Sequence, residues 1–147
     1  MEALDIFEVK EACGCYVEPI NNLLAQLSSS GHCITLGQLQ TMVECAGTHL
    51  FLGSCDGRVV AMLALGEYLA PTGRKMWIED VVVDASVRGR GFGRAMVDCA
   101  IEYARGVGDG VLMLTSRPSR KAANALYRSL GFEQKETNVY VMKMSNI

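Results

Sequence analysis

Long apolar runs are missing from this sequence of 147 residues. A run such as VVAMLALG ends at Arg58 on one side and Glu67 on the other, far short of the ~20 residues that span a bilayer. The opening MEALDIFEVK contains neither a basic n-region nor a small-residue cleavage site, so we expect no signal peptide and no membrane partner. With half of its residues apolar and a fifth charged, the sequence predicts one globular domain, residues 1–147, in the cytoplasm.

The usual zinc-site spacings are missing as well. The six cysteines stand at positions 13, 15, 33, 45, 55 and 99 and include no C-x-x-C pair. Because nothing in the sequence indicates export, we expect free thiols in a reducing compartment and no bound metal. Repeats, low-complexity tracts and Pro/Gly/Ser-rich linkers are also missing, which agrees with a single domain.

A strong net charge of either sign is absent. The formal charge is −2 and the pI is about 5.7, so we expect no nucleic-acid partner. The sum hides an asymmetry, because residues 1–87 carry 4 basic and 11 acidic groups, whereas residues 88–128 carry 8 basic and 3 acidic groups. This distribution predicts a local anion site within 88–128, with a solvated charged face as the alternative.

Hydrophobic periodicity predicts an α/β fold of the α+β type. The predicted order is β-α-α-β-β-β-α-β-α-β-β, with the last two strands at residues 132–137 and 139–144. Three local signals support it: a capping box from Thr35 to Gln38, a hairpin turn at Asp56-Gly57 and a helix cap at Ser119. We therefore expect a mixed, mostly antiparallel sheet of about six to seven strands flanked by about four helices.

Three glycines at alternate positions stand between a valine-rich strand and a helix, in the stretch VRGRGFGRAM from Val87 to Met96. The first backbone N–H groups of a helix lack internal partners, and glycines let that backbone approach a ligand closely. Together with the neighbouring arginines, these groups predict a phosphate site, and a tight turn without a ligand is the alternative. Neither the P-loop pattern nor the dinucleotide fingerprint fits the spacing.

The segment Arg88–Gly93 does fit R-x-x-G-x-G, and it resembles the acyl-CoA pyrophosphate loop of the GNAT superfamily of N-acetyltransferases. The preceding IEDVVVD resembles the central strand of that superfamily, and AANALYRSLGF, residues 122–132, resembles its C-terminal signature. The resemblance covers residues 58–144. It implies an acetyl-CoA-binding core there and a variable acceptor-side part over residues 1–57.

The resemblance also implies which residues hold acetyl-CoA as a co-substrate. Strand backbone would pair with the pantetheine amides, the glycine loop would wrap the pyrophosphate, and Arg117, Arg120 or Lys121 would reach the 3′-phosphate. Superfamily members often carry an asparagine where this chain has Arg120, and Asn124 lies one turn further on. The cofactor-binding residues are thus expected to be Val81, Val82, Val83, Arg88, Gly89, Arg90, Gly91, Phe92, Gly93, Arg94 and Asn124.

For catalysis, the resemblance implies that Tyr127 protonates the departing CoA thiolate, whereas a core tyrosine would be the plain alternative. Glu79 is the expected base that deprotonates the amine, directly or through water, because an alkyl amine is mostly protonated at neutral pH. Strand alternation predicts Glu79 on one face with Trp77 and Val81, and Asp80 on the other. Asp80 and the reserve base Glu67 are expected to contact the acceptor.

The predicted function is therefore direct acetyl transfer from acetyl-CoA to a primary amine of a small molecule or peptide. Two alternatives stay open: a non-catalytic acyl-CoA sensor module, and an amino-sugar acetyltransferase of the glucosamine-6-phosphate type. The stretch IEDVVVD favours that amino-sugar group, whereas LTSRPSRKAAN departs from it. Superfamily members often form homodimers, and nothing in the sequence decides this point.

Overall fold

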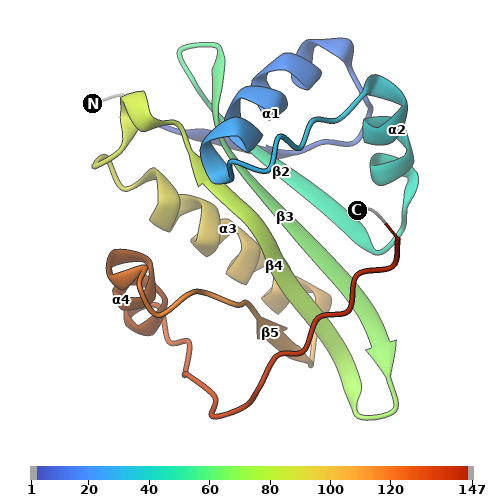
Figure 1. Ribbon diagram of the computed structural model, residues 1–147, viewed down its shortest axis with the longest axis vertical. Helices are drawn as coiled ribbons and strands as arrows, with labels where there is room; N and C mark the ends of the chain where they lie inside the picture. The colour runs from blue at the N-terminus through green and yellow to red at the C-terminus, as the bar shows by residue number, and fades with distance from the viewer. Residues whose placement is uncertain (1–2, 146–147) are drawn as a thin grey trace. The chain divides into compact units, whose positions relative to one another are not determined.

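The computed structural model describes residues 3–145, and the chain divides into two compact units, Met1–Thr115 and Ser116–Ile147. Within the described residues, the first unit holds a five-stranded sheet with three α-helices, and the second holds one α-helix (Figure 1). The elements are β1 (Asp5–Glu8), α1 (Gly14–Leu27), α2 (Leu36–Glu44), β2 (Thr48–Cys55), β3 (Arg58–Ala70), β4 (Gly73–Val83), the 3₁₀ turn η1 (Ala85–Val87), α3 (Phe92–Val107), β5 (Val111–Met113) and α4 (Lys121–Ser129).

The sheet of the first unit has the order β1-β2-β3-β4-β5, in which β1 to β4 pair antiparallel and β5 pairs parallel with β4. The hairpin predicted between β2 and β3 is confirmed. Asp56 and Gly57 take φ values of 53° and 75°, as the two central residues of a type I′ turn require. The mixed, mostly antiparallel sheet predicted from the sequence is therefore present.

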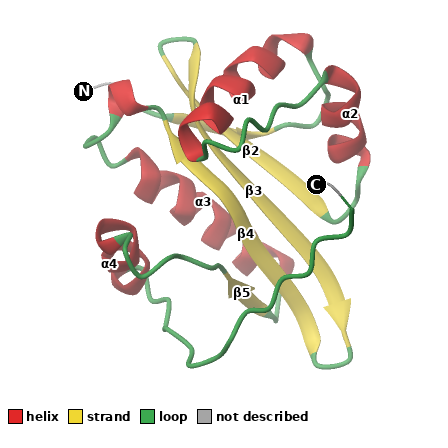
Figure 2. Ribbon diagram, viewed as in Figure 1, coloured by secondary structure: helices red, strands yellow, loops and turns green. Residues whose placement is uncertain are grey.

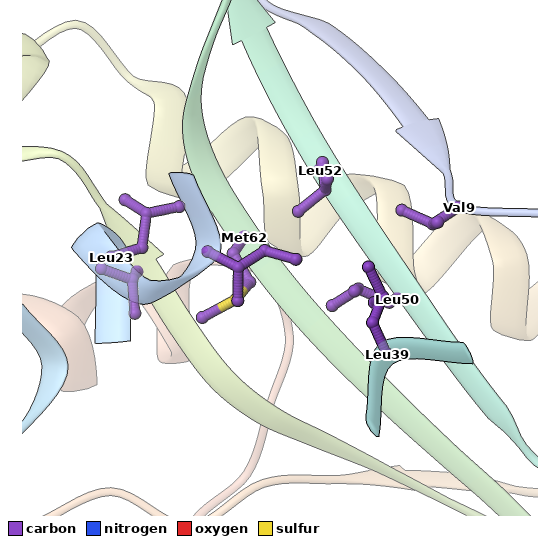
Figure 3. Close-up of a cluster of buried hydrophobic side chains, with 8 residues drawn as sticks. Val9, Leu23, Leu39, Leu50, Leu52 and Met62 are labelled. Carbon is purple, nitrogen blue, oxygen red and sulfur yellow. The ribbon is translucent and has the colours of Figure 1, made fainter. Parts of the chain in front are cut away.

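α1 and α2 pack on one face of the sheet. Figure 3 shows the buried cluster that joins them to β2 and β3, in which Leu23 and Leu39 meet Leu50, Leu52 and Met62. The helical spacing of the leucines in α1 and the alternation in β2 direct these side chains to one place. The capping box predicted at the start of α2 is confirmed, since Thr35 and Gln38 exchange side chain-to-backbone hydrogen bonds.

α3 packs on the opposite face of the same sheet, behind β3 and β4 in Figure 1. Its buried stripe repeats every three or four residues, as an amphipathic helix requires. The buried members are Phe92, Met96, Val97, Ala100 and Ala104. Helices on both faces therefore fix β4, the strand that leads into the glycine loop.

The two C-terminal strands predicted at 132–137 and 139–144 are wrong. Figure 2 draws the described part of this stretch as loop, and the sheet has five strands rather than six to seven. Alternation alone does not make a strand, because each strand needs a partner for its backbone N–H and C=O groups. Tyr140 and Val141 are 87% and 81% exposed, so these side chains also gain no burial.

The cap predicted at Ser119 is wrong as well. α4 begins at Lys121 after Arg120, which forms no side-chain cap. The predicted stop at Gly131 is confirmed: its φ is 100°, and the N–H of Phe132 donates to the carbonyl of Tyr127 at 3.0 Å. Among the described residues, no helix has the length and apolar character that a membrane span requires.

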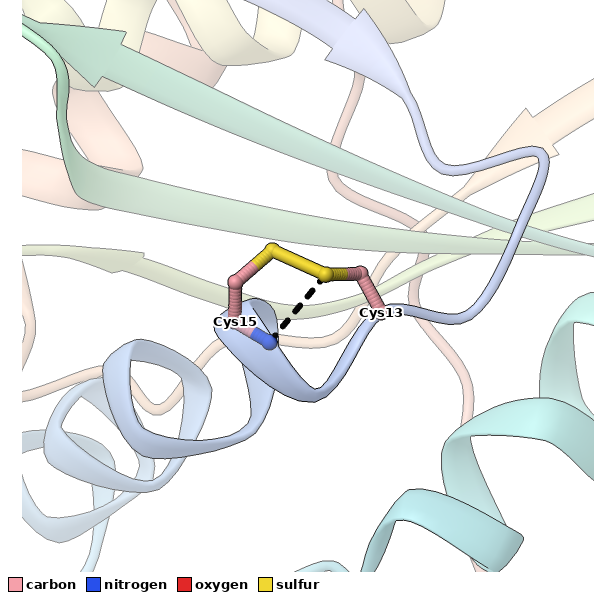
Figure 4. The surroundings of a disulfide bond; sticks show 2 residues. All are labelled: Cys13 and Cys15. Atoms are coloured by element: carbon pink, nitrogen blue, oxygen red, sulfur yellow. Dashed lines mark hydrogen bonds between the residues drawn. A yellow bond between two sulfur atoms is a disulfide. The ribbon is translucent and has the colours of Figure 1, made fainter.

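The expectation that all cysteines are free thiols fails at one place. A disulfide joins Cys13 to Cys15 at the start of α1 (Figure 4). Cys33 and Cys45 are exposed thiols, and Cys99 is a half-buried thiol on α3.

Candidate active site

A β-bulge interrupts β4 a few residues before the glycine loop. β4 holds one residue more than β3 between the pairs Ala64–Glu79 and Met62–Val82. Within the bulge, the backbone of Asp80 takes a φ of 52°, a left-handed conformation that few non-glycine residues adopt. Bulges are common beside active sites, where they redirect side chains and free backbone groups from the ladder.

The bulge decides which side chains share a face. Trp77 and Glu79 lie on the same face, as predicted, because alternation holds up to the bulge. The predicted continuation to Val81 is wrong, since the added residue brings Val82 onto the face of Glu79 instead. This is the face on which α1 and α2 pack, since Val82 belongs to their buried cluster.

Glu79 keeps its carboxylate exposed on this face. Partial burial raises the pKa of Glu79 above the ordinary value of 4.5, and the negative charge of Asp80 raises it further. A carboxylate with a raised pKa accepts a proton more readily, which suits a general base.

Two aromatic side chains lie on the same face of β3 and β4 as Glu79. The indole N–H of Trp77 points to the hydroxyl oxygen of Tyr68 at 3.5 Å, and Tyr68 is 53% exposed. Gly66, which pairs with Trp77, adds no side chain to this surface. A carboxylate and aromatic rings on one face of a sheet are groups that attract an organic cation.

β4 and β5 separate before they reach the glycine loop. Their parallel pairing covers only Lys75–Trp77 of β4. In the described sheet, the edge of β4 from Ile78 to Val83 therefore has no ladder partner in β5. Val82 is 5% exposed, so its side chain belongs to the core while its backbone lies on an open strand edge. Such an edge can pair with an extended ligand that carries amide groups.

The open edge of β4 leads into the glycine loop at the start of α3. Gly89 and Gly91 take φ values of 82° and 79°, which only glycine adopts at low cost. Gly91 is the N-cap of α3, and among the described residues no side chain caps this helix. The first N–H groups of α3, beginning at Phe92, therefore face away from the helix with its positive dipole end behind them.

The arginines around the loop are exposed. Nε of Arg88 donates to the carbonyl of Val83 at 3.2 Å, which fixes that side chain across the loop. Nε of Arg94 lies 4.0 Å from the carboxylate of Asp98, with both side chains 53% exposed. An exposed pair of this kind stabilises little, so Arg94 is available to a stronger anion.

The remaining predicted site residues belong to the second unit. Tyr127 is buried on α4, where its ring meets Phe132 edge-on at a centroid distance of 6.0 Å. Nδ2 of Asn124 donates to the carbonyl of Arg117 at 2.9 Å, so this amide holds the turn before α4. The basic side chains of Arg117, Arg120 and Lys121 are exposed in this unit. Their roles stay predictions.

Glu67, the reserve base, lies in a polar cluster on the α3 side of the sheet. Its carboxylate accepts from Tyr103 at 2.9 Å and from Arg74 at 3.0 Å, and it lies 2.7 Å from Nε2 of His49. Burial alone would raise the pKa of Glu67, but the hydrogen bonds from Tyr103 and His49 outweigh it and lower the pKa. Glu67 is thus an ion-pair partner within this cluster.

Sequence reasoning missed His49 and Tyr103. His49 lies outside every motif found in the sequence. The helical spacing predicts Tyr103 only as a member of the apolar stripe of α3. The two meet because β2 and α3 pack against each other, which no local pattern encodes. The one signal for His49 in the sequence was its polar side chain near the start of the mostly apolar strand THLFLGSC.

The family model of the acetyltransferase (GNAT) family matches residues 20–132. This chain belongs to the GNAT family. The prediction made from the glycine loop, the central strand and the C-terminal signature is thereby confirmed.

Individual GNAT relatives agree with this assignment. Glucosamine 6-phosphate N-acetyltransferase 1 of Oryza sativa subsp. japonica is 29% identical over 108 residues, covering 69% of this chain and 64% of that enzyme. An uncharacterized N-acetyltransferase of Methanocaldococcus jannaschii is 42% identical over 59 residues, covering 40% of this chain and 26% of that protein. The chain therefore matches less than two thirds of the length of either curated relative.

Solved structures share the fold over nearly the whole chain. A protein of Agrobacterium tumefaciens assigned as an acetyltransferase has a TM-score of 0.82 and 26% identity, covering 95% of this chain and 99% of that one. An aminoglycoside N-acetyltransferase solved in complex with CoA has a TM-score of 0.78 and 17% identity, covering 97% and 96%. At 17% identity, the similarity to the aminoglycoside enzyme shows a shared fold alone.

Proposed function

We propose that this GNAT protein transfers the acetyl group of acetyl-CoA directly to a primary amine of a small molecule or peptide. One observation carries the proposal: an open strand edge runs directly into a glycine loop whose backbone amides begin a helix. The edge suits the amide groups of pantetheine, and the loop suits the pyrophosphate that follows them in CoA.

The loop binds the pyrophosphate through backbone geometry. With Gly89 and Gly91 in left-handed conformations, the N–H groups at the start of α3 converge on one anion. Arg88 and Arg94 add cationic donors at the rim, and forked guanidinium groups suit phosphate oxygens. Backbone groups of Val81–Val83 hold the pantetheine arm, which leaves the thioester beside the bulge of β4.

The chemical step needs two proton transfers. Glu79 takes a proton from the ammonium form of the acceptor, directly or through water, so that the neutral amine attacks the thioester carbonyl. The tetrahedral intermediate then expels the CoA sulfur, and the hydroxyl of Tyr127 donates the proton that converts thiolate to thiol. The nitrogen–carbon bond forms and the carbon–sulfur bond breaks, so no acyl-enzyme is required.

The acceptor side favours a cation. Glu79 and Asp80 are exposed at the bulge, and Trp77 and Tyr68 supply aromatic rings on the face that carries Glu79. The first 87 residues carry 4 basic and 11 acidic groups, which attracts a protonated amine. Glu67, paired with His49 and Arg74, lies on the opposite face of the sheet from Glu79.

An amino-sugar phosphate is the second candidate acceptor. The similarity to the rice glucosamine 6-phosphate enzyme, 29% identity over 69% of this chain, favours it. Such an acceptor carries its own phosphate. Binding it therefore requires basic side chains beside the acceptor as well as along CoA.

The test is a thiol-release assay with acetyl-CoA and a panel of a polyamine, an aminoglycoside, a peptide with a free N-terminus and glucosamine 6-phosphate. We expect turnover with at least one amine, and a large loss of kcat in Tyr127→Phe with KM for the acceptor nearly unchanged. Unchanged kcat in Tyr127→Phe would remove this residue from the mechanism. Acetyl-CoA binding without turnover on the whole panel would favour the sensor module.

A further inference from the structure

A disulfide in the first unit lies outside the candidate active site. It joins Cys13 and Cys15 across the single residue Gly14 where α1 begins (Figure 4). Both cysteines are exposed, so solvent thiols reach both sulfur atoms. Nothing in the proposed acetyl transfer uses this bond.

The position of the bond argues against a structural role. A disulfide stabilises mainly by restricting the unfolded chain, and this effect grows with the length of the loop that it closes. Here the loop contains one residue, so the bond restrains little chain. The buried cluster that holds α1 in place, around Ile20 and Leu23, lies further along the helix.

The two sulfur atoms are not equivalent. Cys13 is the N-cap of α1, and its Sγ accepts the backbone N–H of Cys15 at 3.2 Å. A thiolate at this place is stabilised by that donor and by the positive end of the helix dipole. Sγ of Cys13 is therefore the better leaving group when the bond is cleaved.

We propose that Cys13 and Cys15 form a thiol–disulfide exchange centre whose substrate is a small thiol or its disulfide. In the reductive direction, a substrate thiolate attacks Sγ of Cys15, the bond between the two cysteines breaks, and the electron pair leaves on Sγ of Cys13. A second substrate thiolate attacks the substrate sulfur of the mixed disulfide and releases the Cys15 thiolate. The protein gains two electrons and two protons, and two substrate thiols become one disulfide.

In the oxidative direction, the same path runs in reverse: the Cys15 thiolate attacks a substrate disulfide and expels one substrate thiolate, and the Cys13 thiolate then attacks Sγ of Cys15 and expels the other. The second step is favoured by close spacing, because only Gly14 separates the two cysteines. The same N-cap contact that stabilises the leaving thiolate also keeps α1 capped after reduction, so the helix survives the cycle.

The other thiols provide the controls. A hydrogen bond with Thr48 and one with the backbone of Gly47 lower the pKa of the exposed Cys45 thiol, so Cys45 reacts with thiol reagents but has no resolving neighbour one residue away. Burial raises the pKa of the Cys99 thiol, and Glu8 raises it further, which makes this cysteine less reactive. Cys45→Ser is thus the matched control for Cys13→Ser and Cys15→Ser.

The experiment equilibrates the full chain in glutathione buffers of increasing reduced fraction, blocks free thiols with a maleimide and counts the labels by mass spectrometry. We expect wild type and Cys45→Ser to gain two further labels together as the buffer becomes reducing, with a midpoint inside the accessible range. Cys13→Ser and Cys15→Ser should lack this transition, and serine at position 13 still caps α1. A constant label count in the wild type across all buffers would overturn the proposal.

A second measurement tests the assignment of roles. At neutral pH, the Cys13 thiol that remains in Cys15→Ser should react with an aromatic disulfide ~5-fold faster than the Cys15 thiol that remains in Cys13→Ser. Both variants carry Cys33→Ser and Cys45→Ser, which removes the other exposed thiols, so that the remaining pair member is compared on the same background. Equal rates, or a faster Cys15, would overturn the role of Cys13 as the stabilised thiolate.

Discussion

Nε2 of His49 lies 2.7 Å from Oε1 of Glu67, which joins β2 to β3 through side chains that are 13% and 14% exposed. The other ring nitrogen, Nδ1, lies 2.9 Å from the carboxylate of Glu8 on β1. The imidazole of His49 thus bridges two carboxylates, one on each neighbouring strand. The hydroxyl of Tyr103 lies 2.8 Å from Nε2 and ties α3 to the same cluster.

Replacing the ring of His49 should destabilise the fold. In His49→Ala two largely buried carboxylates lose a hydrogen-bond partner, so we expect the free energy of unfolding to fall by ~1–3 kcal/mol. Arg105→Ala is the matched control, since it removes an exposed pair with Glu102 and should change stability by less than ~0.5 kcal/mol. Urea unfolding of both variants checks this. Equal stability of the two would contradict the importance of the cluster.

The same cluster predicts sensitivity to acid. The pKa of Glu67 lies below 4.5 because hydrogen bonds from Tyr103 and His49 outweigh its burial, and the pKa of Glu8 lies below 4.5 because bonds from His49 and Lys10 outweigh its burial. A carboxyl with a lowered folded pKa adds stability above its unfolded pKa and loses it as pH falls through the folded pKa.

Urea unfolding measured from pH 7 down to pH 3 should therefore show stability falling below about pH 4.5. Glu67→Gln removes one of the two titrating groups, so its stability should fall less steeply over the same range. Parallel curves for wild type and Glu67→Gln would show that this carboxyl does not respond to pH as its contacts require.

Tyr103 gives a prediction at the alkaline end. Burial, and after it the hydrogen bond to Glu67, raise the pKa of Tyr103 to about 12. A raised pKa means that the neutral phenol stabilises the fold up to its unfolded pKa of about 10 and ceases to do so as pH rises through about 12. Phenolate absorbance should show a late-titrating tyrosine in the wild type that is missing from Tyr103→Phe. If Tyr103→Phe keeps that late step, another tyrosine produces it.

Glu79 should set the acid limb of the activity. Glu79→Gln should lower kcat/KM by ~10²–10⁴, because the ammonium form of the acceptor is no longer deprotonated. In the wild type the limb should lie above pH 4.5, since burial and Asp80 raise the pKa of Glu79. Asp80→Asn removes the repulsion, so the limb should move to lower pH. A limb that does not move in Asp80→Asn would argue that Glu79 is not the base.

The glycines of α3 offer a matched pair of variants. Gly91→Ala places a side chain at a φ of 79°, which costs ~1–2 kcal/mol of stability. Gly106→Ala lies inside the same helix with no atom within 4 Å of the added methyl, so it should stabilise by ~0.5–1 kcal/mol. Thermal unfolding compares them. A Gly91→Ala protein as stable as the wild type would show that the loop tolerates another conformation.

Local signals allowed much of the fold to be predicted from the sequence. The capping box at Thr35, the turn at Asp56-Gly57 and the glycine loop before α3 each depend on a few adjacent residues, and each is confirmed. The strands at 132–137 and 139–144 failed because a strand also needs a partner that alternation does not supply.

The site was predictable only in part for the same reason. The loop residues are contiguous, so one motif predicts them together, and their role in binding stays a prediction. The bulge at Asp80 depends on how β4 pairs with β3, and alternation along one strand does not reveal that register. The contact between His49 and Tyr103 depends on packing between residues 54 apart in the chain.

The central claim is that the open edge of β4 and the glycine loop hold acetyl-CoA. A crystal structure of the full chain with acetyl-CoA tests it most directly. We predict pantetheine amides within ~2.9 Å of backbone groups of Val81–Val83, and pyrophosphate oxygens on the N–H groups between Gly89 and Arg94. A cofactor bound elsewhere, or a loop that stays empty at saturating acetyl-CoA, would contradict the account.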